Sequence, residues 1–224
     1  HQFTREQQDA YALETLARAQ RATKNGDFKR EITPVTMTTR KGDVVVDTDE
    51  LPRRAMPDKI PSLRPAFGKD GTVTAANASG ISDGAAALVL MRKSEAERRG
   101  LKPLARIVAT AAHAHEPAYF TTAPVPAMRK AVERAGWTIE DVDLWEINEA
   151  FAVVPMIAMK ELGLSHDKVN VNGGACALGH PIGASGARVI VTLIAALEKH
   201  GKTKGVASLC IGGGEATAVA IERL

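Results

Sequence analysis

The segment 172–188 constrains this chain more than any other part of it. Glycines stand at positions 173, 174, 179, 183 and 186 of that segment, and His180 lies among them. Glycine permits positive φ and close approach of the backbone to other groups. An apolar run precedes the segment and a longer apolar run, 189–197, follows it. The pattern predicts a strand, a tight loop and a helix. Histidine transfers protons near neutral pH, so the loop is a candidate reaction centre.

The bulk composition is that of an ordinary globular protein and excludes several classes of partner. Apolar residues make up 45% of the 224 residues, charged residues 25%, and the net charge is +3. Basic and acidic residues are mixed, and aromatic residues reach only 4%, so we expect no nucleic-acid partner. No apolar run is long enough for a membrane span, and segment 1–6 lacks a signal-peptide core. Two cysteines do not make a disulfide framework, which indicates a cytoplasmic protein with reduced thiols.

The hydrophobic pattern alternates between strand and helix signals. Helices are predicted over 4–25, 94–100, 125–135, 149–162 and 185–200. Strands are predicted over 31–39, 44–47, 104–111, 142–147, 169–171, 206–211 and 216–221. Segments 72–77 and 85–91 are predicted as strands or buried segments, and the proline-rich stretch 49–71 as an extended loop. Alternating elements with a glycine-linked final hairpin predict an α/β fold, a mixed β-sheet covered by helices.

Three polar side chains follow three predicted strands. Asn148 follows strand 142–147, His180 lies in the loop after 169–171, and Cys210 ends strand 206–211. Taken singly, such residues are most often a helix cap, a structural histidine and a small buried hydrophobe. Ligands of α/β sheets bind at the carboxyl ends of the strands, so neighbouring strands would bring the three together. A thiol, an imidazole and an amide there favour acid–base or nucleophilic chemistry.

Other polar residues receive a structural interpretation. Ser185 does not fit a nucleophile elbow, because Gly186 follows it directly, and we expect it to cap the first turn of helix 185–200. His113 and His115 have no second ligand pair at a fitting distance, so no metal site is predicted. Cys176 is expected to pack as a small apolar residue.

Four segments of the chain resemble the thiolase family. They are 148–152 (Asn-Glu-Ala-Phe-Ala), the loop 172–186, the segment 210–214 (Cys-Ile-Gly-Gly-Gly) and segment 71–85. The resemblance covers essentially the whole chain and implies a thiolase-like α/β fold whose N-terminal half-domain is largely missing. It implies that residues 1–71 are part of a CoA-binding loop domain, residues 72–100 a remnant of the N-terminal thiolase domain, and residues 101–224 the C-terminal thiolase domain.

The resemblance also assigns roles to the site residues. Cys210 would be the acid/base that moves the α proton. His180 would activate a nucleophilic cysteine and help hold the thioester oxygen, and Asn148 would position a water that completes this oxyanion site. The Gly212 N–H would help form a second oxyanion hole, and Glu149 would support the site electrostatically.

Coenzyme A is implied as a substrate, without a permanently bound cofactor. Ser79 matches a position near the pantetheine, and Phe151 would line the pantetheine tunnel. Arg53, Leu63 and Phe67 fall in the loop region that holds the nucleotide. Segment 75–78 is similar to one whose backbone carbonyls bind K+ in some thiolases.

The implied reaction is reversible thiolytic cleavage or Claisen condensation of a short 3-ketoacyl-CoA, with acetoacetyl-CoA and CoA giving two acetyl-CoA. The family's nucleophilic cysteine has no match here, so we expect the isolated chain to be inactive and to correspond to the later part of a thiolase. A homodimer or homotetramer is implied, in the cytoplasm, or in the mitochondrial matrix of a eukaryote. Two alternatives stay open: a cysteine hydrolase using Cys210, His180 and Asn148, and a non-catalytic relative that binds CoA or lipid.

Overall fold

A four-stranded mixed sheet organises the computed structural model, which describes residues 1–224. The strands follow the order β3 (Ala105–Ala114), β6 (Glu215–Arg223), β5 (Lys204–Cys210) and β4 (Leu144–Ile147). Strands β4 and β5 are parallel, whereas β6 is antiparallel to both of its neighbours. The predicted mixed sheet and its closing hairpin are therefore confirmed.

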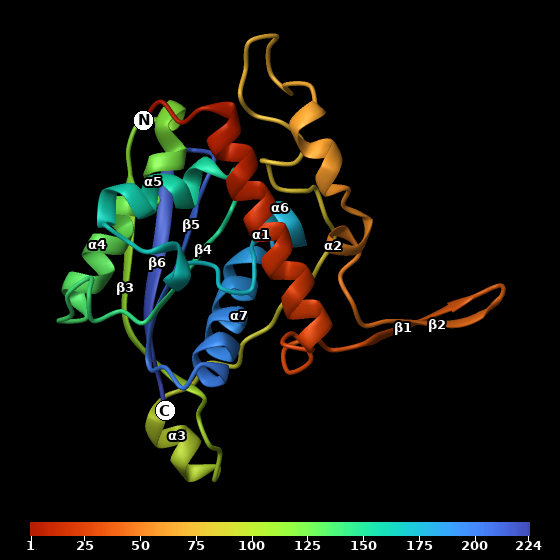
Figure 1. Ribbon diagram of the computed structural model, residues 1–224. Helices are drawn as coiled ribbons and strands as arrows, with labels where there is room; N and C mark the ends of the chain where they lie inside the picture. The colour runs from red at the N-terminus through yellow and green to blue at the C-terminus, as the bar shows by residue number, and fades with distance from the viewer.

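Helices cover both faces of this sheet (Figure 1). Helices α4 (Pro124–Arg134) and α5 (Val153–Leu162) pack on one face, against Trp145 and Ile147 of β4. Helix α7 (Ser185–Lys199) packs on the other face, where Leu193 meets Leu144. Successive side chains of a strand point to opposite faces, so the four buried side chains of β4 pack against both layers of helices.

Helix α1 (Arg5–Asn25) lies alongside the short helix α6 (Ala175–Leu178) (Figure 1). Thr4 and Gln7 form a capping box at its start, and Gly26, with a φ of 75°, ends it in the left-handed conformation. The capping box and the terminating glycine can both be recognised in the sequence, and the predicted helix is confirmed.

The first hairpin projects from the body of the molecule (Figure 1). Its strands are β1 (Val35–Thr39) and β2 (Gly42–Val46), and every residue of both is exposed. The stretch 49–71 was predicted as an extended loop, but it contains helix α2 (Leu51–Arg54) and the 3-10 helix η1 (Pro57–Ser62). Proline in the first turn of both segments favours helix formation, because the ring presets φ and the missing N–H has no partner there anyway.

Segments 72–77 and 85–91, predicted as strands or buried segments, form no strand, and only the first contains buried residues, Thr74 and Asn77. Residues 72–77 form a turn in which the Thr74 N–H donates to Asn77 Oδ1 at 2.7 Å. Residues 85–91 carry no strand, because no other segment lies beside them to accept their hydrogen bonds. Val89 and Leu90 are consequently 85% and 70% exposed. Helix α3 (Lys93–Arg98) follows, and Arg92 is its N-cap, without a cap from Ser94.

Two predicted elements near the loop 172–188 are shorter than expected. Helix α5 begins at Val153, not at Glu149, because Phe151 forms an antiparallel bridge with Ala78 first. Residues 169–171 contribute only a bridge between Val169 and Trp145. Short 3-10 helices complete the chain at η2 (Pro117–Thr122) and η3 (His166–Lys168). None of the helices combines the length and the apolar character that crossing a membrane requires.

Two carboxyl groups lie against helix α7, Glu146 fully buried and Glu31 partly buried. Glu146 of β4 is 2% exposed, with its Oε2 3.7 Å from a guanidinium nitrogen of Arg188 and its Oε1 without a partner. Burial raises the pKa of Glu146 to about 8, because desolvation outweighs the attraction of Arg188. Burial likewise raises the pKa of Glu31 to about 7, although its Oε1 accepts a hydrogen bond from Thr192 at 3.2 Å.

Replacement of Glu146 by Gln should flatten the pH dependence of stability. The folded state binds the Glu146 proton more tightly than the unfolded state does, so this stabilisation is complete below pH about 4.5 and is lost as the pH rises through about 8. We expect the Tm of Glu146→Gln to exceed that of the wild type by a few degrees near pH 8.5 and to match it near pH 5. Thermal unfolding followed by circular dichroism across this range measures the difference. The exposed Glu97→Gln on α3 is the control, and parallel curves for wild type and Glu146→Gln would contradict the assignment.

Candidate active site

The three predicted strand ends are neighbours in the sheet. Strand β4 has β5 on one side, and the Asn148 N–H donates to the Ser208 carbonyl at 2.9 Å just beyond its end. On the other side the Asn170 N–H donates to the Trp145 carbonyl at 2.9 Å. Asn148, the loop that carries His180, and the end of β5 therefore meet at one edge of the sheet.

His180 and Asn148 are in direct contact. Asn148 Nδ2 lies 3.3 Å from His180 Nε2, and His180 Nδ1 lies 2.6 Å from Ser185 Oγ. Ser185 Oγ in turn donates to the Pro181 carbonyl at 3.0 Å. Ser185 does not cap helix α7 as expected, since the N-cap is Ala184 and no side chain caps this end. Its hydroxyl orients the imidazole instead.

One proton arrangement satisfies all three contacts. The Ser185 hydroxyl uses its proton on Pro181, so it accepts the Nδ1–H of His180, and His180 Nε2 then accepts from the Asn148 amide. Burial and then the charge of Arg188 lower the pKa of His180, which favours the neutral ring. A neutral imidazole with its Nε2 lone pair toward Asn148 is able to accept a proton at neutral pH.

The glycines of the loop are needed where the chain passes close to other groups. Gly179 has a φ of 93°, and a Cβ there would overlap the Ser82 hydroxyl. The His180 N–H donates to the Gly80 carbonyl at 2.9 Å. Segment 80–82 therefore fixes the backbone of His180, and this close approach depends on the missing side chain at 179.

Cys210 ends β5 as a free, buried thiol. It packs in the core on the α4 and α5 side of the sheet, with Val206 and Ala216. It makes no hydrogen bond to His180 or Asn148. Desolvation raises its pKa to about 11, so it is a protonated thiol at neutral pH and able to donate a proton. Two residues further on, the Gly212 N–H donates to no protein group, and the space beside its Cα is open.

Glu149 points away from this pair and into the protein. Its buried carboxylate accepts hydrogen bonds from Tyr11, Thr15, Asn170 and the Cys176 N–H, at 2.8 to 3.1 Å. These donors come from α1, the loop after η3 and α6. Glu149 thus joins helix α1 to the site and makes no hydrogen bond to the His180 or Asn148 side chain.

The residues expected to bind CoA lie partly together. Phe67, 79% exposed, has its ring centroid 6.4 Å from that of Phe151. The Ser79 N–H donates to the Ala150 carbonyl at 3.1 Å, so Ser79 adjoins Phe151. Phe120 also packs edge-on against Phe151, with ring centroids 6.2 Å apart, a neighbour that the sequence did not reveal because it lies 31 positions earlier in the chain.

The two remaining residues of this group lie in the stretch 49–71. The Leu63 carbonyl accepts a hydrogen bond from Arg5 at 2.9 Å, which ties the stretch to α1. Arg53 is exposed on α2, two residues after Leu51, whose side chain lies against Gly80. Cys176, expected to pack, lies half-buried against Tyr11 and Met156.

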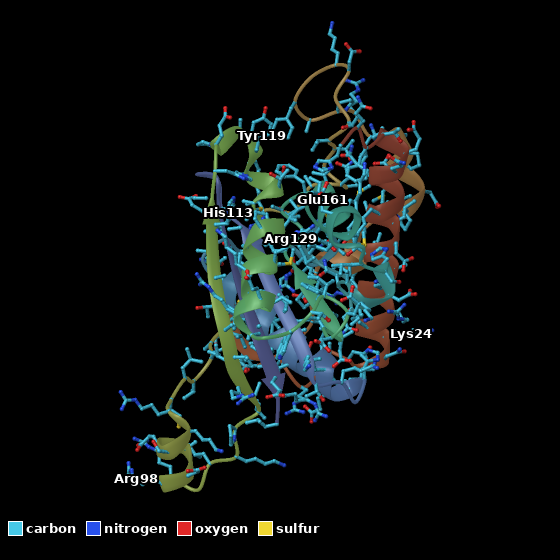
Figure 2. All side chains as sticks on the ribbon, turned by 90° about the vertical axis from the view of Figure 1, so that its left-hand side faces the viewer. Lys24, Arg98, His113, Tyr119, Arg129 and Glu161 are labelled. Carbon is cyan, nitrogen blue, oxygen red and sulfur yellow. The ribbon has the colours of Figure 1, made fainter.

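His113 of β3, and His115 just after this strand, lie on the far side of the sheet from α7. Figure 2 views the α4 side, where His113 of β3 and Arg129 of α4 are labelled. His113 Nδ1 lies 3.1 Å from Lys130 Nζ, and His115 Nε2 lies 2.8 Å from the Tyr119 carbonyl. An ammonium group beside His113 opposes a cation there, and no group of three or more metal-ligating side chains occurs in the structure.

Comparison with known proteins finds family models and relatives that match almost the whole chain. The family models that match are the C-terminal domain of thiolase over residues 101–223 and the N-terminal domain of thiolase over residues 1–94. The chain is 54% identical over 224 residues to an acetyl-CoA acetyltransferase of Rhizobium meliloti (strain 1021), a match that covers 100% of this chain and 57% of the relative. It is 54% identical over 225 residues to the cytosolic acetyl-CoA acetyltransferase of Mus musculus, which covers 99% of this chain and 57% of the relative.

Solved structures agree with this placement. The crystal structure of the Bacillus anthracis acetyl-CoA acetyltransferase superposes with a TM-score of 0.95 at 48% identity, covering 99% of this chain and 57% of that one. The Acat5 thiolase of Ascaris suum in complex with coenzyme A gives 0.87 at 44% identity, covering 99% and 56%. This chain thus spans little more than half the length of the proteins it matches. With family models over both of its parts and relatives at about half identity, the chain belongs to the thiolase family.

Proposed function

We propose that the protein containing this chain transfers acyl groups between thiols, cleaving or condensing a short 3-ketoacyl-CoA such as acetoacetyl-CoA. The observation that carries the proposal is the contact between His180 Nε2 and Asn148 Nδ2, beside the end of the strand that carries Cys210. The names of the relatives, acetyl-CoA acetyltransferases, support the same reaction.

In the cleavage direction a cysteine thiolate attacks the 3-keto carbonyl, and the bond between the second and third carbons breaks. The acyl group stays on the cysteine sulfur as a thioester, and the departing acetyl-CoA carbanion takes the proton of Cys210. A second CoA thiol then gives its proton to the Cys210 thiolate and attacks the thioester. The acyl group leaves on CoA, and the released cysteine thiolate takes back the proton held by His180. The raised pKa of Cys210, about 11, suits this proton donation, because the thiol is protonated before the bond breaks.

His180 and Asn148 serve the cysteine nucleophile and the developing oxyanion. The neutral imidazole accepts the thiol proton, and the imidazolium then stabilises negative charge on the thioester oxygen. Asn148 Oδ1 is buried without a partner, so it is free to hold the water of this oxyanion site. The unused Gly212 N–H is available to the carbonyl of the acyl-enzyme.

The nucleophile is proposed to lie outside these 224 residues. Burial and the neighbouring Glu149 raise the pKa of Cys176 well above its usual value, and burial raises that of Cys210 as well. Neither thiol is therefore suited to be the attacking thiolate. The same reasoning disfavours a cysteine hydrolase built on Cys210, which in addition has no hydrogen bond to His180.

Coenzyme A is proposed to run past Ser79, Phe67 and Phe151, with Leu63 and Arg53 toward its nucleotide end. The aromatic contacts of Phe151 and the adjoining Ser79 support this path. We further propose K+ at the carbonyls of segment 75–78, a cytoplasmic or mitochondrial-matrix location, and assembly into a homodimer or homotetramer.

Removal of the Cys210 thiol should abolish the carbon–carbon chemistry. For Cys210→Ala in the full-length protein we expect CoA-dependent cleavage of acetoacetyl-CoA to fall about 10²- to 10⁴-fold, the usual contribution of a general acid or base. Cys176→Ala, which removes the other thiol, is the control and should keep activity. Unimpaired cleavage by Cys210→Ala would refute the role of this residue. CoA binding without turnover by the wild type would favour the non-catalytic alternative.

Loss of the Ser185 hydroxyl should misorient His180. Without the acceptor at Nδ1 the ring is free to rotate and to change tautomer, so we expect Ser185→Ala to lower kcat about 10- to 100-fold with little change in KM. Steady-state kinetics of the full-length protein give the two constants. Ser185→Thr retains a hydroxyl and should recover part of the loss. Equal activity of Ser185→Ala and wild type would show that the 2.6 Å contact is not needed.

A further inference from the structure

Asn170 combines three unusual features. Its φ of 47° lies in the left-handed region, which it shares with only one other non-glycine residue, Gln2 near the N-terminus. It is 1% exposed. It also stands two residues before the loop that carries His180, at the point where the chain leaves its bridge with β4. A left-handed, fully buried asparagine is held there by its surroundings.

The Asn170 side chain replaces a neighbouring strand. Its Oδ1 accepts the Ile147 N–H at 2.8 Å, and its Nδ2 donates to the Ile147 carbonyl at 2.8 Å. The main chain of Asn170 already pairs with Trp145, so the amide side chain extends this edge of β4 by one residue. Both backbone groups of Ile147 are thereby fixed, directly before Asn148.

The Asn170 side chain also binds the residue directly after Asn148. Asn170 Nδ2 also donates to Glu149 Oε1 at 2.9 Å, in the buried group of donors around that carboxylate. The residues on both sides of Asn148 are therefore held by one amide. Asn148 itself has only its N–H bond to Ser208 and its contact with His180.

We propose that Asn170 is a positioning residue that aims the Asn148 amide at His180. It clamps the strand end that carries Asn148 and sets the exit of the loop that carries His180, so one side chain fixes the separation of the two. The proposal rests on the function proposed above as far as catalysis is concerned. The geometry of the pair is independent of it.

The variant Asn170→Gly removes the side-chain hydrogen bonds to Ile147 and Glu149, here called the clamp, but keeps the left-handed backbone conformation possible. Glycine adopts a φ of 47° without steric cost, so a residue needed only for the left-handed turn would be replaced without loss. If the clamp matters, kcat for acetoacetyl-CoA cleavage by the full-length protein falls about 10- to 100-fold, while KM changes less than about threefold. The pKa of His180, followed by imidazole NMR, then rises by about 0.5 or more. The reason is that the neutral Nε2 loses the hydrogen bond from Asn148 while Arg188 stays in place.

Controls distinguish positioning from general destabilisation. Leu197→Ala opens a cavity in the core beneath α7 and should lower the Tm while leaving kcat and the His180 pKa unchanged. If Asn170→Gly does not fold, Asn170→Asp carries the same test. It keeps the shape and accepts from Ile147 N–H, but its carboxylate cannot donate to Ile147 or Glu149, so the same loss of kcat is expected; the added charge raises the His180 pKa by itself, so kcat alone is the readout for this variant.

The outcomes separate the two proposals. Wild-type kcat and an unchanged His180 pKa in the folded Asn170 variant would overturn the positioning role. An equal loss in Leu197→Ala would also overturn it, because the effect would then be one of stability alone. An inactive wild-type protein would refute the proposed function, while the His180 pKa of wild type and variant would still decide the role of Asn170.

Discussion

A single buried carboxylate, that of Glu149, ties together the parts of the molecule on which the site depends. A carboxylate deep in a protein is costly unless strong donors surround it. Glu149 has donors from α1, from α6 and from the loop after η3. The close packing extends to the backbone, since a Cβ at Gly174 would overlap the Glu149 carboxylate. Helix α1, matched by the N-terminal thiolase domain, is thereby locked to the strand end and the glycine loop of the C-terminal domain.

Burial has opposite consequences for the two groups proposed to move protons. Desolvation disfavours the charged form of either group, so it lowers the pKa of His180 and raises that of Cys210. The imidazole is thus neutral and ready to accept a proton, while the thiol is protonated and ready to donate one. Burial therefore prepares a base and an acid in segments that follow neighbouring strand ends, and the charge of Arg188 lowers the pKa of the base further.

The sequence was sufficient for elements whose signals are local. Helix α1, with its cap at Thr4 and its stop at Gly26, and the hairpin of β5 and β6 follow from nearby residues. The contact of Asn148 with His180 could be anticipated from strand ends alone. The role of Ser185 was misjudged, because a hydroxyl at a helix start usually caps it, and only the fold brings this one to His180. Asn170 was not singled out at all, since its hydrogen bonds to Ile147 and Glu149 span more than 20 residues.

The conformation of the stretch 85–91 could not be predicted from its own residues either. In this case the local strand signal was present, and the long-range partner was missing. Its apolar residues signal a strand, but strand formation needs a partner, and none of the 224 residues supplies one. An extended, uncharged, proline-free run with bare Val89 and Leu90 is the kind of template on which other chains stack. Until something covers it, this stretch is a hazard for aggregation and a natural target for chaperones. Expression of residues 1–224 by themselves would therefore favour inclusion bodies. A charged residue at position 89 or 90 is a direct way to keep the protein in solution.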